Sequence, residues 1–137
     1  MIHCLVDSDI ILDVYLRREP FAIYSAQVLN YIKYKKIKGS VTALSLANVY
    51  YILSKGSSKK LIIAELIKLT SFVEVESMNN KTVQNALFSD FSDFEDALQN
   101  FSAENNSSIS HIVTRNVKDY KSSKLVVLSP KEFLAVV

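Results

Sequence analysis

Near its start the chain reads Ile2-His3-Cys4-Leu5-Val6-Asp7-Ser8-Asp9-Ile10-Ile11-Leu12-Asp13. Residues 2–6 are a short apolar run that ends at Asp7. Such a run is typical of a buried parallel strand with a polar residue at its carboxyl end. We expect a helix to begin soon after it, so that Asp7 stands at the junction of a strand and a helix.

Strands and helices are predicted to alternate along the rest of the chain. Apolar residues three and four apart predict helices over residues 20–36, 44–54, 59–69, 80–88 and 94–104. Apolar or alternating runs predict strands at residues 40–43, 72–76, 109–114 and 125–128. Ser129 caps a terminal helix that begins with Pro130, and Ser92 or Asp93 caps the helix at 94–104. This order predicts an α/β fold with a parallel sheet between layers of helices.

Length and composition narrow the class of protein. The 137 residues suit a single domain, residues 1–137, and the scarcity of Gly and Pro, 2 of each, argues against a turn-rich all-β sandwich. The only cysteine, Cys4, excludes an internal disulfide framework and a multi-cysteine zinc site. Because neither a secretory signal nor an apolar run of roughly 18 residues is present, we expect a soluble cytoplasmic protein with no membrane association.

Charge is unevenly distributed, although the formal net charge is only +2. Residues 20–64 hold 7 lysines and no acid, whereas residues 65–104 hold 8 acids and 2 lysines. A metal-dependent enzyme that acts on a polyanion needs lysines to hold phosphates and carboxylates to hold the cation. The alternative is that both segments are solvated surface. Four of the lysines lie at a predicted helix end, where cations are favourable in any case, namely Lys33, Lys35, Lys36 and Lys38.

Polar side chains lie near the expected carboxyl ends of the strands, where ligands collect in parallel sheets. They are Asp7, Asn48, Asp93, Asp96, Asn116 and Asp119. Carboxylates crowded in one cleft repel one another unless a cation lies between them, and Mg²⁺ accepts such ligands. Metal-assisted phosphodiester hydrolysis is the natural use of this arrangement. His3 and His111 lie inside predicted strands and are expected to be structural rather than general bases.

Several stretches along the chain carry a family resemblance. They are Val6-Asp7-Ser8-Asp9-Ile10-Ile11-Leu12-Asp13, Ala43-Leu44-Ser45-Leu46-Ala47-Asn48-Val49-Tyr50-Tyr51, Asp93-Phe94-Glu95-Asp96-Ala97-Leu98, and Ile112-Val113-Thr114-Arg115-Asn116-Val117-Lys118-Asp119-Tyr120 followed by Leu128-Ser129-Pro130-Lys131-Glu132-Phe133. In this order they resemble the successive motifs of the PIN domain, especially those of VapC-type toxins and their small prokaryotic relatives. The resemblance implies a three-layer α/β/α sandwich with a central parallel sheet of about five strands. It also implies a ribonuclease site at the rim of the sheet that depends on Mg²⁺ or Mn²⁺.

The resemblance implies metal-ligating and catalytic residues. Asp7, Asp96 and Asp119 match the acids that hold the metal, and Asp9 stands where the family often has Asn. Many PIN nucleases have Glu at the catalytic position occupied here by Asn48. An Asn oxygen can still coordinate a cation, but the site loses one negative charge, so we expect weaker metal binding.

The last motif implies the substrate contacts. Thr114, Arg115 and Asn116 are expected to bind substrate, and the last metal ligand is Asn116 or Asp119, since family members differ on this point. RNA is the implied substrate. An antitoxin protein and a second copy of the chain, forming a homodimer, are the implied partners.

Other interpretations stay open at this point. With Asn48 in place of an acid, the chain could be a catalytically weakened PIN-like domain that binds RNA or protein. Asp7-Ser8-Asp9 after an apolar strand also resembles the first motif of haloacid-dehalogenase-type phosphatases, but the chain lacks a convincing set of that family's later motifs. Five aromatic residues with helical spacing are expected in the core rather than as platforms for nucleobases, namely Phe21, Tyr50, Tyr51, Phe101 and Phe133.

Overall fold

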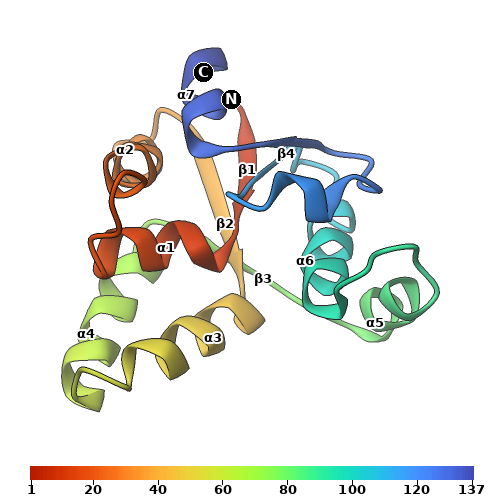
Figure 1. Cartoon of the computed structure of the whole chain (residues 1–137). Coiled ribbons are helices and arrows are strands. Elements are labelled where there is room, and N and C mark those ends of the chain that lie inside the picture. The colour runs from red at the N-terminus through yellow and green to blue at the C-terminus, as the bar shows by residue number, and fades with distance from the viewer.

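Five parallel strands form one central sheet in the order β3-β2-β1-β4-β5 in the computed structural model, which describes all of residues 1–137 (Figure 1). The strands are β1 (His3–Val6), β2 (Lys38–Thr42), β3 (Glu74–Glu76), β4 (His111–Val113) and β5 (Val126–Leu128). The helices are α1 (Ser8–Tyr15), α2 (Ala22–Lys33), α3 (Ala43–Leu53), α4 (Lys59–Thr70), α5 (Asn80–Leu87), α6 (Phe94–Glu104), the 3₁₀ helix η1 (Val117–Tyr120) and α7 (Pro130–Val136). The predicted α/β sandwich is confirmed.

The helices form two unequal layers. Helices α1, α2, α3, α4 and α7 pack against one another on one side of the sheet, and α6 with α5 and η1 lies on the other side (Figure 1). Neighbouring residues of β1 point to opposite faces, so Val6 belongs to an apolar cluster of 17 buried residues and Leu5 to one of 5. The larger cluster lies under α1 and α2, and the smaller one lies under α6.

The predicted elements are all present, with small shifts at their ends. Helix α6 has the expected bounds and is capped by Asp93 rather than Ser92. Ser129 caps α7 and Pro130 is its first residue, as predicted. Helix α2 begins at Ala22, past Pro20, and β2 passes into α3 without a connecting loop. No helix combines the length and the hydropathy that crossing a membrane requires.

The expectation that the aromatic residues are all in the core is partly wrong. Phe133 is fully buried and Tyr50 packs against the larger cluster, but Phe21 is 39% exposed and Tyr51 is 68% exposed. Phe21 occupies the N-cap position of α2, outside the apolar face of that helix. Tyr51 lies on the solvent side of α3. Helical spacing identified the helices correctly but could not say which of two adjacent residues faces the sheet.

Candidate active site

Polar side chains form the junctions at which strands pass into helices. The side chain of Asp7 accepts a hydrogen bond from the backbone N–H of Ser8 at the start of α1, directly after β1. The hydroxyl oxygen of Thr42 accepts one from the N–H of Ser45 at the start of α3, directly after β2. Asp93 caps α6 in the same way. The starts of α1, α3 and α6 therefore lie together at the carboxyl edge of the sheet.

A cavity of about 230 Å³ lies between these helix starts and the segment that follows β4. Six acidic side chains line this hollow, which we call the acidic cavity, and no lysine or arginine does. The acids are Asp7, Asp9, Asp93, Glu95, Asp96 and Asp119, and the neutral polar residues are Ser8, Asn48, Gln99 and Asn116. So many carboxyl groups in one hollow are unfavourable unless protons or cations offset their charge.

Asp7 is buried at the end of β1 and accepts hydrogen bonds from four residues. Its Oδ1 accepts hydrogen bonds from the N–H of Ser8 at 2.7 Å and from Gln99 Nε2 at 3.3 Å. Its Oδ2 accepts them from Thr114 Oγ1 at 2.8 Å and from the hydroxyl of Tyr120 at 3.2 Å. Both oxygens are therefore fixed in position before any ligand arrives.

Asp9 lies in the first turn of α1 and has one oxygen without a partner. Its Oδ2 accepts hydrogen bonds from the backbone N–H of Arg115 at 3.1 Å and from Asn116 Nδ2 at 3.4 Å. Its Oδ1 is buried and accepts none. Burial, together with the charge of Asp7, raises the pKa of Asp9 to about 7. A buried carboxylate oxygen that lacks a donor is an open position for a cation.

Asp96, on α6, is linked to Asp7 through Tyr120. The Tyr120 hydroxyl lies 3.3 Å from Asp96 Oδ1 as well as near Asp7, and it has one hydrogen to share between them. Burial, followed by the charges of Asp7, Asp93 and Asp119, raises the pKa of Asp96 to about 7. Burial also raises the pKa of the Tyr120 phenol, so this hydroxyl keeps its proton. The crowding of carboxylates that the sequence predicts therefore makes Asp96 bind its proton more tightly.

Asn48 lines the acidic cavity and contacts an acid. Its Nδ2 donates a hydrogen bond to Glu95 Oε2 at 3.3 Å. Asp93, which also lines the cavity, uses its Oδ1 to accept a hydrogen bond from the N–H of Asp96 at 3.0 Å. The acid that Asn48 contacts is therefore Glu95, not Asp93.

The structure brings five of the predicted site residues to one cavity, namely Asp7, Asn48, Asp96, Asn116 and Asp119. Thr114 is fully buried and its hydroxyl donates to Asp7, so it does not line the cavity as a substrate-binding residue would. The side chain of Arg115 points away from the acidic cavity and binds Asp13. Asp119 is exposed at the rim.

Sequence reasoning missed Gln99, Ser45, Tyr120 and Glu95, and it gave Asp9 no definite role. Gln99 Nε2 donates to Ser45 Oγ at 2.6 Å as well as to Asp7, and its Oε1 accepts from Thr42. A signal for two of these residues was present. Gln99 lies three residues after Asp96, and Ser45 lies three before Asn48, so each pair shares one face of its helix.

Four lysines of the basic segment lie away from the acidic cavity. Lys33, Lys35, Lys36 and Lys38 occupy the end of α2 and the start of β2, which is the amino edge of the parallel sheet. Figure 1 shows this edge near the two chain ends, away from the junctions between β1 and α1 and between β2 and α3. These four lysines therefore lie at the opposite edge of the sheet from the strand ends that lead into the acidic cavity.

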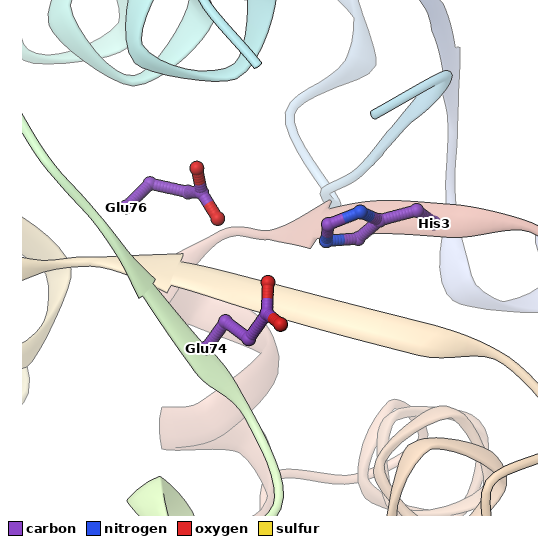
Figure 2. A group of neighbouring side chains, drawn as sticks. All are labelled: His3, Glu74 and Glu76. Carbon is purple, nitrogen blue, oxygen red and sulfur yellow. The ribbon is translucent and has the colours of Figure 1, made fainter. Parts of the chain in front are cut away.

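A second group of metal-ligand side chains is a satisfied polar network. Figure 2 shows His3 on β1 with Glu74 and Glu76 on β3, and one ligand atom of each lies within 4.8 Å of the others. His3 Nε2 contacts Ser40 Oγ at 2.7 Å, Ser40 donates to Glu76 at 2.7 Å, and Glu74 pairs with Lys38 at 3.2 Å. Burial lowers the pKa of His3, as befits a structural histidine. Each of the three side chains already has a protein partner.

Comparisons with known proteins agree with this fold. Ribonuclease VapC1 of Aquifex aeolicus (strain VF5) is 26% identical over 133 residues, which are 93% of this chain and 90% of that protein. A toxin-antitoxin complex from Klebsiella pneumoniae matches with a TM-score of 0.69 at 17% identity, over 93% of this chain and 97% of that one. VapBC-1 from nontypeable Haemophilus influenzae gives 0.66 at 16% identity, over 96% and 99%. The PIN domain family matches residues 3–118, a span that includes every residue of the acidic cavity except Asp119, and the chain therefore belongs to the PIN domain family.

Proposed function

We propose that this protein is a divalent-metal-dependent endoribonuclease that hydrolyses RNA phosphodiester bonds. One observation carries the proposal: six acidic side chains share a cavity of about 230 Å³ that has no basic residue. A phosphate would be repelled from this cavity unless a cation bound there first. The name of the Aquifex relative, ribonuclease VapC1, supports RNA as the substrate.

The residues present fit Mg²⁺ or Mn²⁺. The donors are carboxylate and amide oxygens, with no thiolate or imidazole, and hard cations prefer such donors. Asp7, Asp96 and Asp119 are the proposed ligands, and the unpartnered Oδ1 of Asp9 is a further candidate. A bound ion supplies Lewis-acid stabilisation of the charge that develops on the phosphate.

The protein's own residues orient the site. Thr114, Tyr120 and Gln99 donate to Asp7 and hold its carboxylate still, so we propose that Thr114 is a positioning residue. Tyr120 couples Asp7 to Asp96, because one hydroxyl touches both carboxylates. Asn116, which is exposed at the rim, remains the proposed substrate contact next to the cavity. Asn48 and Glu95 together take the place of the family's usual acid.

Cleavage of a labelled oligoribonucleotide tests the proposal. We expect cleavage with Mg²⁺, none with EDTA, and a loss of about a hundredfold or more in Asp7→Asn and Asp96→Asn, since each change removes a charged ligand at nearly constant shape. Asp90→Asn is the matched control, because Asp90 is an exposed acid of the same segment that does not line the cavity. Cleavage that resists the chelator would reject the metal mechanism. Cleavage that neither substitution affects would indicate a contaminant.

The proposal also includes two protein partners, an antitoxin and a second copy of the chain. The similar structures include toxin-antitoxin complexes, so we propose that the protein is the toxin of a type II pair, acts in the cytoplasm as a homodimer and is held inactive by a small antitoxin. Co-expression with the product of a short adjacent reading frame should give a complex that lacks nuclease activity. Light scattering on the purified protein measures its molar mass and so shows whether it is a dimer. A monomer with full activity would remove the dimer from the proposal.

Two alternatives are weaker. A PIN-like domain that binds RNA without cutting it would explain Asn48, but the acidic cavity still holds six acids, and Glu95 lies beside Asn48. The phosphatase interpretation is not favoured, because the family match is to the PIN domain.

A further inference from the structure

A second hollow, of about 560 Å³, lies beside the acidic cavity and is lined by aromatic rings and cations. Its walls are the start of α2 with Phe21 and Tyr24, the segment after β4 with Arg115, and the start of α7 with Lys131. We call this hollow the aromatic pocket. Asn116, the residue after Arg115, lines the acidic cavity, so consecutive residues of the chain line the two hollows.

Arg115 is held over the ring of Phe21 by a buried acid. Its Nε lies 2.7 Å from Asp13 Oδ2 and its Nη2 lies 2.8 Å from Asp13 Oδ1, and Asp13 is fully buried. The Arg115 Cζ atom lies 4.0 Å from the centroid of the Phe21 ring. Two hydrogen bonds and a ring on one face fix the guanidinium plane, while the side chain stays 24% exposed. A fixed guanidinium plane is a surface on which a nucleobase stacks.

Positive charge in this region is only partly neutralised. Arg18 reaches the same carboxylate at 3.8 Å, so two guanidinium groups share Asp13. Lys131 forms no ion pair, and its Nζ lies 5.8 Å from the centroid of the Tyr24 ring. Since the acidic cavity next to it repels phosphate, a polyanion that reaches that cavity gains most from cations placed just outside it.

We propose that the aromatic pocket binds an unpaired nucleobase of the RNA substrate, with Arg115 and Tyr24 as stacking surfaces and Lys131 on the adjoining phosphate. This inference rests on the proposed ribonuclease function and specifies its substrate. Aromatic side chains interleaved with cations are typical of single-strand binding, and a base must leave its helix before it can stack on protein. The RNA is therefore single-stranded at the nucleotide beside the cleaved bond.

A pair of matched double variants tests the pocket. Tyr24→Leu with Lys131→Gln removes one ring and one charge from it. Tyr34→Leu with Lys33→Gln removes the same groups at the other end of α2, where Lys33 Nζ also lies 5.8 Å from a tyrosine centroid. Both proteins lose the same net charge, so any difference between them is due to location. Thermal melts establish whether both double variants are folded. If the Tyr24 and Lys131 variant is unfolded, the single variant Lys131→Gln replaces it in the assay.

The assay measures kcat and KM on a fluorescein-labelled 12-nucleotide single-stranded RNA with Mg²⁺. We expect KM to rise about tenfold in the Tyr24 and Lys131 variant, which is the contribution of roughly one stacked base, with kcat within twofold. The Tyr34 and Lys33 variant should match the wild type. A 12-base-pair duplex of the same sequence should show no such difference. If both variants raise KM equally, or neither does, the pocket does not bind the RNA base and is open to another occupant such as a protein side chain.

Binding of the same labelled RNA in EDTA, followed by fluorescence anisotropy, separates the two proposals. If the wild type binds RNA but does not cut it with Mg²⁺, the proposed nuclease activity fails, and the pocket is still judged by the difference between the two variants. If the wild type cuts RNA and the variants do not differ in KM, only the pocket fails. Absence of both binding and cleavage overturns both proposals.

Discussion

Two carboxyl groups of the acidic cavity, those of Asp9 and Asp96, hold their protons to near neutral pH, because burial and neighbouring acids raise the pKa of each to about 7. A cation binds the ionised forms, so below pH 7 it must displace these protons. We predict that Mg²⁺ affinity rises about tenfold between pH 6 and pH 7 and levels off above pH 8. Calorimetry at three pH values measures this. The Asp96→Asn variant should show a flatter dependence, and an affinity that does not change with pH would contradict the prediction.

Asn48 gives a second prediction for a single residue. Replacing it with Glu adds a negative charge near the cation site, and we expect about tenfold tighter Mg²⁺ binding, or about 1.4 kcal/mol. In the absence of metal the new Glu would lie beside Glu95 and lose the hydrogen bond that Asn48 now donates, so the metal-free variant should melt at a lower temperature than the wild type. Calorimetry and thermal melts measure the two effects.

The control for this change is Asn48→Gln, which has the length of Glu without its charge. If the Glu variant binds Mg²⁺ no more tightly than the Gln variant, residue 48 lies outside the electrostatic reach of the cation. The assignment of Asn48 to the family's acidic position would then be wrong.

At the scale of single elements, the contact between α2 and β2 depends on a glycine. A Cβ added to Gly39 on β2 would overlap the side chain of Ile32 on α2, and a β-branched side chain in a helix has little freedom to move aside. We predict that Gly39→Ala lowers the free energy of unfolding by about 1–3 kcal/mol, the usual cost of overpacking. Urea denaturation measures the change.

Gly56, the only other glycine, is the matched control for this substitution. Nothing lies within 4 Å of a Cβ added to it, and no glycine in the chain has a positive φ. Gly56→Ala should therefore be neutral or stabilise the protein by up to about 1 kcal/mol, through the unfolded state. Equal destabilisation by both substitutions would show that the close packing of β2 on α2 is not the cause.

At the scale of the whole molecule, the acidic cavity makes stability depend on pH and metal. The folded-state pKa of Asp9 and Asp96, about 7, lies above the ordinary value of 3.8, so the folded protein binds more protons than the unfolded chain between these values. Stability is therefore lost as pH rises through 7. We predict a lower melting temperature in EDTA at pH 8 than at pH 6.5, and recovery of this loss with Mg²⁺.

His3 and His111 have lowered pKa values in the folded protein, so their protonation below pH 6.5 decreases stability as pH falls. The comparison of pH 6.5 with pH 8 therefore avoids the range in which the histidines oppose the carboxyl groups. Thermal melts of the wild type and of Asp96→Asn, each with EDTA and with Mg²⁺, make the comparison. The variant should lose part of the pH dependence in EDTA. Equal melting temperatures of the wild type at both pH values would mean that these carboxyl groups titrate normally.

Features with a local cause could be predicted from the sequence. Hydrophobic spacing and capping residues depend on neighbours within one or two turns, so the order of strands and helices, the bounds of α6 and the cap at Ser129 were predicted correctly. The convergence of Asp7, Asn48 and Asp96 on one cavity also followed, because parallel strands end at the same edge of a sheet.

The detailed environment of each side chain depended on the tertiary structure. The donors that fix Asp7 include Gln99, 92 residues away, and Thr114, 107 residues away, and Arg115 meets Asp13 across 102 residues. No local pattern encodes such distances, which is why the open oxygen of Asp9 and the exposure of Phe21 could not be read from the sequence. Local propensity determines which element a residue joins, whereas burial and charge at a site are sums over all the elements that pack around it.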